Sequence, residues 1–494
     1  MINARCIKKE LIFFKTQKSS SIMTIIDIII KVMQDRKYKV LLVNPTDNFS
    51  KLHFYKEKCQ ISTTLSIRSI FAVTPEDFEV TLVNECFEKM DFDVDVDIVG
   101  ITGLTHNVKI AYKMAQEFKK RSKTVVMGGY HVSALPHEAK KYADSVVVGE
   151  GDIVWPKLLQ DFKQNKLKPF YYSKTPVDLI NLPFPVTDSF KFEKLGNLHT
   201  SFPIQASRGC PNKCSFCAIT YFHKHQVRYR PIEKIVEEIK LKKPKYIFFI
   251  DDNLTINYNF AKELFVALKP LNIKWSAQCS ITIAQHPELL QLAKQSGCFC
   301  LYIGLESINQ ESLNSVKKGF NKVEEYKKAI AKINQCNIGI VSLLMFGFDN
   351  DTKKIFKDTL KFLDEVKILH AEFSMVIPFP STPLFEQLKK GSRIIDYDWN
   401  HYHPGNHCVF KPKNMTPNEL EKGQKWLLIK HCLPHRVLQR IWKHRKNNFL
   451  INTYLIFVDI PYVNFFVVPF FVKLISIKDW FERSVAIDNK SGLP

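Results

Sequence analysis

Three closely spaced cysteines are the residues of this sequence best suited to chemistry. The segment SRGCPNKCSFC places Cys210, Cys214 and Cys217 in a C-x3-C-x2-C array. At the cysteine frequency of this chain, a given triple spacing would arise by accident with a probability of about 0.01. Three thiolates on one loop can hold three corners of a cubane iron–sulfur cluster and leave the fourth iron open to a substrate or cofactor.

Zinc is the alternative for the same loop. His223 and His225 follow the cysteines closely, and a structural zinc ion takes four ligands of these kinds. Arg208 and Lys213 flank the thiolates, where they would either offset part of a cluster's negative charge or lie solvated on the loop. The spacing therefore predicts a metal centre and favours an iron–sulfur cluster, because the array itself has no fourth ligand.

The cysteine loop follows the first of six short, apolar runs that are typical of strands. These runs are residues 203–207, 246–251, 274–279, 300–306, 338–347 and 371–379. Segments with helical periodicity separate them, at residues 232–239 and at about 258–269, 286–296, 322–335 and 353–367. Six strand and helix repeats predict a parallel barrel or partial barrel, whose functional residues lie at the carboxyl ends of the strands.

A second alternation precedes this barrel. Residues 38–45, 97–104, 124–130 and 145–151 are short apolar runs, and residues 108–121 have helical spacing. Strand, crossover helix and strand predict a doubly wound parallel sheet, which binds ligands at the carboxyl edge of its strands. Small residues at that edge would let a bulky flat ligand approach the backbone. They are Gly103, Gly128, Gly129, Gly149 and Gly151.

The segment CPNKCSFC, with Phe216 directly before the last cysteine, resembles the cluster loop of radical S-adenosylmethionine (radical SAM) enzymes. The resemblance extends over residues 200–390 and implies a 4Fe–4S cluster held by Cys210, Cys214 and Cys217. It implies that residues at the ends of later strands bind S-adenosylmethionine: Asp251, Asp252, Asn253, Gly304, Glu306, Ser307 and Gly347. The alternative for the two aspartates is that they cap the N-terminus of the next helix.

The chemistry of that family implies a reaction for this chain. The reduced cluster donates one electron to S-adenosylmethionine bound at the open iron, which yields methionine and a 5′-deoxyadenosyl radical that removes hydrogen from a substrate carbon. The implied partners are a small-molecule substrate and a one-electron reductant such as flavodoxin or ferredoxin.

The N-terminal sheet resembles the cobalamin-binding domain of cobalamin-type radical SAM enzymes. The segment GGYHVSALPHEAKKYADSVVVGEGD is similar to the GG turn and VxGEGE stretch of that class, which implies cobalamin contacts at Gly128 and Gly129. Thr102 and Leu104 take the place of a Ser-x-Leu signature. The loop NPTDNFSKLHF places His53 outside the Asp-x-His-x-x-Gly frame that supplies a cobalt ligand. The resemblance therefore implies cobalamin without a histidine ligand, and a sheet that merely covers the barrel is the alternative.

The 494 residues leave room for two to four domains. We expect a leader at 1–33, a cobalamin-binding-like domain at 34–170, a linker at 171–195, the partial barrel at 196–395 and a helical, apolar tail at 396–494. The apolar run 22–33 is too short to span a bilayer and no cleavage site follows it, which favours a packed leader over a targeting peptide. Two prolines and Asp459 interrupt the apolar segment 449–475, which indicates a buried cap or an interfacial membrane contact.

The formal net charge of +22 suits anionic cofactors or a membrane surface, and no nucleic-acid motif accompanies it. Twelve cysteines without a clear signal peptide indicate a cytoplasmic protein. The predicted function is a cobalamin-dependent C-methyltransferase of the radical SAM type, with a lipid-like molecule as one candidate substrate and a peripheral membrane contact through the C-terminus. The alternatives are radical cyclisation, rearrangement or oxidation without methyl transfer, and a non-catalytic iron–sulfur protein.

Overall fold

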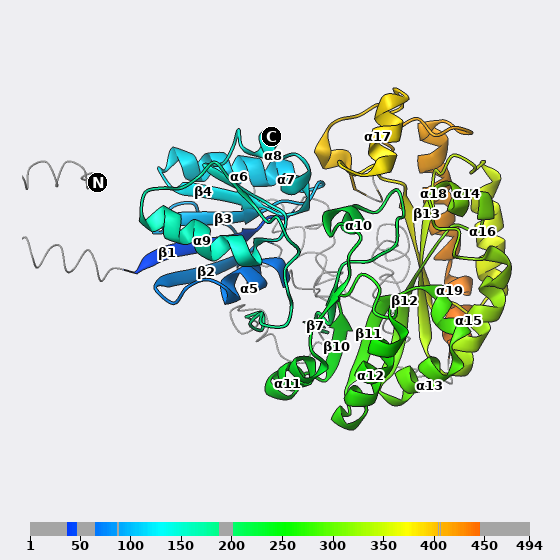
Figure 1. The fold of residues 1–494 in the computed structure, drawn as a ribbon. Helices are drawn as coiled ribbons and strands as arrows, with labels where there is room; N and C mark the ends of the chain where they lie inside the picture. The colour runs from blue at the N-terminus through cyan, green and yellow to red at the C-terminus, as the bar shows by residue number, and fades with distance from the viewer. Residues whose placement is uncertain are drawn as a thin grey trace, which may run out of the picture.

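Two six-stranded parallel sheets form the framework of the chain (Figure 1). The computed structural model describes residues 37–46, 65–85, 88–186, 201–403, 405 and 407–444. The first sheet is blue to cyan in Figure 1 and the second is green to yellow. The predicted fold class, a doubly wound sheet followed by a partial barrel and a helical tail, is confirmed. The predicted leader, His53 and the apolar segment 449–475 lie outside the described residues.

The first sheet has the strand order β2-β1-β3-β4-β5-β6. Its strands are β1 (Tyr38–Asn44), β2 (Phe78–Asn84), β3 (Ile98–Thr102), β4 (Thr124–Gly128), β5 (Ser145–Val148) and β6 (Phe170–Tyr172). The sequence patterns predicted β1, β3, β4 and β5. They missed the two edge strands, because β2 interleaves charged and polar residues with apolar ones and β6 has three residues.

Helices cover both faces of this sheet, as expected for a doubly wound fold. They are α5 (Leu65–Ala72), α6 (Val108–Lys120), α7 (Tyr130–Ala134), α8 (Pro136–Ala139) and α9 (Gly151–Lys163). Side chains of α5 and α9 pack with Val40 and Leu42 on one face, and those of α6, α7 and α8 pack with Leu41 and Val43 on the other. Successive side chains of β1 point to opposite faces of the sheet, and the cluster that each joins assigns each helix to its face.

The second sheet has the order β14-β13-β12-β11-β10-β7 and stays open between β14 and β7, so it is a partial barrel. Its strands are β7 (Phe202–Ile204), β10 (Tyr246–Phe249), β11 (Lys274–Cys279), β12 (Cys298–Glu306), β13 (Gly339–Phe346) and β14 (His370–Met375). The helices between them are α11 (Ile232–Lys242), α12 (Tyr258–Leu268), α13 (Pro287–Gln295), α14 (Gln310–Ser315), α15 (Tyr326–Gln335) and α16 (Lys354–Glu365). All six predicted barrel strands are present.

The cysteine loop lies on the side of the barrel that faces the first sheet. A short antiparallel pair, β8 (Ser207–Arg208) and β9 (Arg228–Tyr229), encloses the loop and the helix α10 (Ala218–Phe222). Helix α10 contacts α7 of the first sheet. The chain therefore brings its metal-ligand candidates close to the carboxyl edge of the first sheet.

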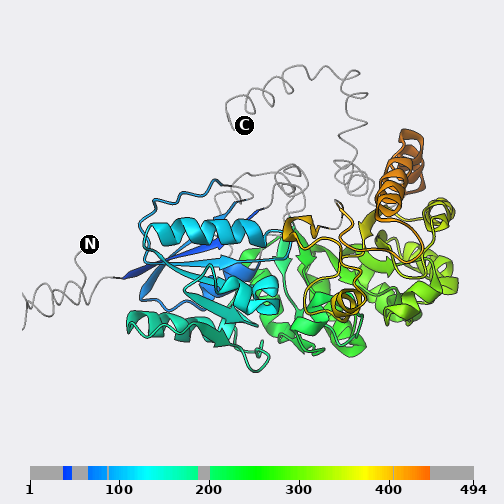
Figure 2. The ribbon, with the colours of Figure 1, turned by 90° about the horizontal axis from the view of Figure 1, so that it is seen from above.

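Three further helices follow the barrel: α17 (Pro383–Lys390), α18 (Pro417–His431) and α19 (Pro434–His444). Helix α18 packs against α16 and β14, and Figure 2 shows the orange α18 and α19 on the side of the barrel away from the first sheet. Between α17 and α18, Ile394 and Phe410 form an antiparallel bridge. No helix among the described residues is long and apolar enough to cross a bilayer.

Candidate functional site

The three cysteines share one loop between β8 and α10. Cys210 and Cys214 are buried and Cys217 directly precedes α10. The backbone N–H of Ser215 donates to the carbonyl of Val316 at 3.1 Å, which attaches the loop to the segment after α14. Burial raises the pKa of all three thiols, that of Cys214 to about 11. A cation is therefore needed to stabilise the thiolate forms.

Sulfur spacing separates the two metal interpretations of this loop. Zinc–sulfur bonds are about 2.3 Å long, so thiolates around one zinc ion lie within about 4 Å of one another. Among the described residues, one group of three potential ligands lies within 4.8 Å, and it does not include the cysteines. The ring Nδ1 of His223 lies 3.0 Å from Arg228, and that of His225 lies 3.2 Å from the Asn212 carbonyl. The three thiols do not form such a group and each histidine ring already has a polar partner, so the zinc alternative finds no support among the described residues.

A lysine that the sequence patterns did not single out lies beside these thiols. Lys318 Nζ is 2.6 Å from Glu306 Oε1, and the charge of Lys318 lowers the pKa of each of the three cysteines. Gly304 makes room for the pair, because a Cβ there would lie 2.5 Å from the Glu306 carboxylate. Arg208 is not solvated, as one alternative had it: its guanidinium binds carboxylates of the first domain.

The two predicted aspartates follow β10 and tie the cysteine loop to the barrel. The Asp251 carboxylate accepts hydrogen bonds from the N–H of Ala206 at 3.0 Å and from the Ser207 hydroxyl at 2.5 Å, and burial raises its pKa to about 7. Asp252 accepts from the N–H of Gly209 at 2.9 Å, and burial raises its pKa to about 6. Neither aspartate is a helix cap, because Asn257 caps α12.

Asn253, Ser307 and Gly347 use their polar groups within turns of the barrel. Asn253 Oδ1 accepts from the N–H of Ser280 at 3.2 Å, and Ser307 Oγ accepts from that of Asn309 at 3.0 Å. Gly347 has a φ of +103°, and a Cβ there would lie 2.7 Å from a side chain of α18. Of the residues predicted to bind S-adenosylmethionine, Asp252 and Glu306 are the two whose charges act on the cysteine thiols.

A cavity of about 430 Å³ lies between the carboxyl edge of the first sheet and the cysteine-loop side of the barrel. The four residues predicted to contact cobalamin, Thr102, Leu104, Gly128 and Gly129, all line it. The barrel contributes Gln205, Arg208, Ile219, Phe222, His223, Ile250 and Asp252 to its wall. The cavity also extends between the first sheet, α5 and α9, where it is lined by Leu42, Ile67, Val126 and Trp155.

The wall of this cavity suits a large flat cofactor. Gly129 has a φ of +107°, and a Cβ there would lie 2.8 Å from the Gly103 carbonyl oxygen. A Cβ at Gly100 would lie 3.1 Å from the Trp155 ring. Backbone without side chains at the sheet edge, together with an apolar slot behind it, fits a corrin ring and its aromatic tail.

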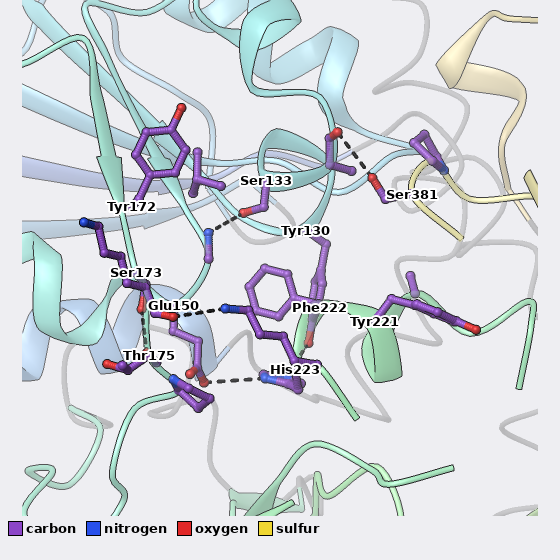
Figure 3. Close-up of a pocket in the computed structure, with 18 residues that line it drawn as sticks. Tyr130, Ser133, Glu150, Tyr172, Ser173, Thr175, Tyr221, Phe222, His223 and Ser381 are labelled. Carbon is purple, nitrogen blue, oxygen red and sulfur yellow. Dashed lines mark hydrogen bonds and ion pairs between the residues drawn. The ribbon is translucent and has the colours of Figure 1, made fainter. Parts of the chain in front are cut away.

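A second cavity of about 680 Å³ opens beside the first, between the same two domains (Figure 3). The two cavities share five lining residues: Tyr130, Gly149, Glu150, Phe222 and His223. Ser133 Oγ accepts from the N–H of Gly149 at 2.9 Å, and Ser381 Oγ donates to the carbonyl of Ala134 at 3.3 Å, which joins a loop after β14 to α7. Residues from both domains thus enclose one connected space.

A buried ionic network joins the domains at this point. Glu150 accepts hydrogen bonds from Arg208 at 3.0 Å, from Arg228 at 2.6 Å and from the N–H of Val177 at 2.8 Å. Arg208 also lies 2.9 Å from Asp152. Burial by itself would raise the pKa of Glu150, but the bonds from Arg228 and Val177 outweigh it and hold that pKa below its usual range. Sequence patterns identified the GEG segment and not this ion pairing.

His223 connects the network to Tyr130. Arg228 donates to Nδ1 of His223, and burial lowers the pKa of His223 to about 4, so the neutral ring carries its proton on Nε2. That nitrogen lies 3.4 Å from the hydroxyl of Tyr130, and Figure 3 shows the two side chains together at the cavity wall. The Tyr130 hydroxyl accepts from His223 and keeps its own proton available for a ligand.

Two family models match the chain in the order of its two sheets. Residues 63–159 match the B12 binding domain and residues 204–363 match the radical SAM superfamily. The chain is 32% identical over 401 residues to bacteriochlorophyllide d C-12(1)-methyltransferase of Chlorobaculum tepidum, which covers 78% of this chain and 86% of the relative. It is also 32% identical over 375 residues to bacteriochlorophyllide d C-8(2)-methyltransferase of the same organism, covering 72% of this chain and 82% of the relative.

Solved structures share the fold. The methyltransferase TsrM from Kitasatospora setae, determined with cobalamin and a 4Fe–4S cluster bound, aligns with a TM-score of 0.59 at 16% identity over 78% of this chain and 85% of its own. OxsB, determined with aqua-cobalamin and S-adenosylmethionine bound, aligns with a TM-score of 0.61 at 13% identity over 86% of this chain and 73% of its own. With its two matching family models and its methyltransferase relatives at 32% identity, this chain belongs to the cobalamin-dependent radical S-adenosylmethionine enzymes, whose cofactors are a 4Fe–4S cluster, S-adenosylmethionine and cobalamin.

Proposed function

We propose that this enzyme transfers a methyl group from S-adenosylmethionine to a carbon atom of a small-molecule substrate. The observation that carries the proposal is the lining of the 430 Å³ cavity, in which Gly128 and Gly129 of the first sheet face Ile219 and Asp252 of the barrel. Residues suited to cobalamin and residues beside the cluster loop thereby share one enclosed space. Methyl transfer to carbon requires that shared space, because the methyl carrier and the radical initiator act on the same substrate atom.

When bound, the three cofactors supply the electron, the hydrogen-abstracting radical and the methyl group. The residues of the chain hold and position them. Cys210, Cys214 and Cys217 would hold three irons of the cluster, and Lys318, whose side chain is 14% exposed, would offset the negative charge of the thiolates. The hydroxyl of Tyr130 is a fixed donor at the wall of both cavities, so it orients an acceptor atom of whichever ligand lies there.

The second cavity supports a large, flat and mainly apolar substrate. Tyr130, Tyr172, Tyr221 and Phe222 contribute four aromatic rings to its wall. The two relatives at 32% identity are named for bacteriochlorophyllide d, a large conjugated ring compound. We therefore propose a flat ring compound as the substrate class.

The products from S-adenosylmethionine test the proposed function. Anaerobically reconstituted full-length protein, supplied with reductant, cobalamin and S-adenosylmethionine, should form 5′-deoxyadenosine and, in a cobalamin-dependent manner, S-adenosylhomocysteine. Cys210→Ala should abolish 5′-deoxyadenosine, whereas Cys336→Ala, outside the loop, should preserve it. Formation of 5′-deoxyadenosine without S-adenosylhomocysteine in the presence of bound cobalamin would refute methyl transfer in favour of radical chemistry of another type.

The lipid-like substrate and the peripheral membrane contact stay predictions, because they depend on the apolar segment 449–475, which lies outside the described residues. Co-sedimentation of the full chain with anionic liposomes tests both. Equal recovery of the protein in the supernatant with and without liposomes would contradict them.

A further inference from the structure

Between α17 and α18, residues 394–403, 405 and 407–410 belong to a strap that leaves the barrel, touches the first domain and returns. Its ends meet in the bridge between Ile394 and Phe410. Within the strap, Trp399 donates to the Glu138 carboxylate at 3.0 Å and Asp398 lies 2.9 Å from Lys109, so a hydrogen bond and an ion pair attach the strap to the first domain. The strap also carries the sequence HYHPGNH, with three histidines in seven residues.

We infer that a divalent transition-metal ion of the zinc class binds the strap through Asp396, His401 and His407. One ligand atom from each of these residues lies within 4.8 Å of the others, and they are the one group of this kind in the part of the chain that the structure describes. Asp396 Oδ2 lies 2.6 Å from Nδ1 of His401 and 3.3 Å from Nε2 of His407. Ligand atoms around a tetrahedral ion with bonds of about 2.0 to 2.1 Å lie about 3.3 Å apart.

Outer contacts orient two of the three ligands. The N–H of Asp398 donates to Oδ1 of Asp396 at 2.7 Å, which leaves Oδ2 directed at the two imidazoles. The second ligand, His407, has its Nδ1 3.1 Å from Glu421 Oε1. The N–H of Cys408 donates a hydrogen bond to the same oxygen at 2.9 Å. A carboxylate on the far nitrogen of a histidine selects the tautomer whose other nitrogen can bind a metal.

The donor set identifies the class of ion. Two imidazoles and one carboxylate suit zinc and its neighbours among the first-row metals, whereas calcium and magnesium prefer oxygen ligands. His401 and His407 are 48% and 43% exposed, so water can supply a fourth ligand and the ion can enter without unfolding the strap. This position is separate in sequence from the cysteine loop and uses no thiol.

A bound ion would connect the outgoing and returning halves of the strap. Asp396 and His401 lie on the half that contacts α6 and α8 of the first domain, and His407 lies on the half that leads to α18. Holding the two halves together restricts the loop between them and thereby stabilises the contact between the tail and the first domain. The proposed role is structural and does not depend on methyl transfer.

Zinc titration of the full chain tests this inference. Substituting Cys210, Cys214 and Cys217 with alanine removes the competing thiols and gives a triple variant that serves as the background for the test. This background should bind one zinc ion per chain, measured by calorimetry, and bound zinc should raise the midpoint of its thermal unfolding. Adding His407→Ala should abolish the binding. Adding Glu421→Gln should weaken it by about tenfold to a hundredfold, because the carboxylate acts only through His407.

The control is His137→Ala, which removes an exposed histidine of α8 in the same background and should leave zinc binding unchanged. Far-UV circular dichroism checks that each variant is folded, and Asp396→Asn replaces His407→Ala if that variant is not. Failure of the background to bind zinc, or equal binding by a folded strap variant, would overturn the inference. Neither outcome bears on the formation of 5′-deoxyadenosine, so the two proposals fail independently.

Discussion

Glu150 is the residue whose replacement most directly tests how the two domains are held together. Its side chain is 8% exposed, and those of its partners Arg208 and Arg228 are 12% and 14% exposed. The carboxylate thus compensates two buried guanidinium groups and also accepts from a backbone N–H. Glu150→Ala removes all three interactions and leaves a small gap beside the cofactor cavity.

The structure sets the size of the effect. Removing one partner of a buried ion pair costs about 3 to 5 kcal/mol. Arg208 keeps Asp152 and Arg228 keeps the carbonyl of Val177, so we expect the lower end of that range, about 3 kcal/mol, for Glu150→Ala. Glu150→Gln retains polar atoms but turns two charge-assisted bonds into weaker ones, which should cost about 2 kcal/mol.

Urea unfolding of the full chain, followed by circular dichroism, measures both values. The matched control is Glu237→Gln, because Glu237 pairs with Lys234 at 2.9 Å on an exposed helix face, where an ion pair contributes less than about 1 kcal/mol. A loss of stability for Glu150→Ala no larger than that of the control would refute the reasoning that this network is buried and coupled.

The dependence on pH supplies a second check. Because the pKa of Glu150 is lowered in the folded state, its stabilising contribution is present above the unfolded value of about 4.3 and is lost as the pH falls through the lower folded value. The difference in the free energy of unfolding between the wild-type chain and Glu150→Gln should therefore be constant between about pH 6 and pH 8. It should shrink below about pH 4.3. A difference that grows on acidification would contradict this assignment.

Three further substitutions test the cavity wall, the cluster surroundings and the tail. Gly129→Ala places a methyl group 2.8 Å from the Gly103 carbonyl at a φ of +107°, and the strain of about 1 to 2 kcal/mol should reduce cobalamin retention, read from absorbance, by about tenfold. Lys318→Met leaves Glu306 buried and unpaired beside the thiols, at a cost of about 3 to 5 kcal/mol, and should lower the iron content after reconstitution. Gly423→Ala drives a methyl group into an aromatic ring of α16 and should destabilise the chain by about 1 to 3 kcal/mol in thermal unfolding.

Each of these predictions has a clear opposing result. Gly391→Ala is the control for the glycine variants, because Gly391 has a φ of −80° and the nearest atom to an added Cβ is 3.4 Å away. Unchanged cobalamin retention in Gly129→Ala would show that the cofactor does not use this wall. Wild-type iron content in Lys318→Met would exclude a role for the Lys318 charge in cluster binding. A Gly423→Ala variant as stable as Gly391→Ala would show that α18 does not pack closely against α16 at Gly423.

Local patterns in the sequence were sufficient to predict most of the fold. The barrel strands and the four central strands of the first sheet are rich in apolar residues, because parallel strands covered on both faces bury most of their side chains. The cysteine spacing likewise predicted a cluster loop, since its three ligands lie within eight residues. The glycines at the strand ends predicted where a flat ligand approaches, and four of the five, Gly128, Gly129, Gly149 and Gly151, line the cavity between the domains. All of these signals are contained within short stretches of chain.

Contacts between distant residues were decided by the tertiary structure alone. Lys318 lies about a hundred residues from the cysteines that it faces, and Glu150 lies 58 and 78 residues from the arginines that it binds. The strap brings His407 to Glu421 and Asp396 in the same way, although no motif joins them. The sequence around a charged residue is the same whether its side chain is solvated or buried in an ion pair with a residue distant in the chain. Sequence periodicity therefore determined which elements form, and the packing of the two sheets against each other decided which of their charges meet.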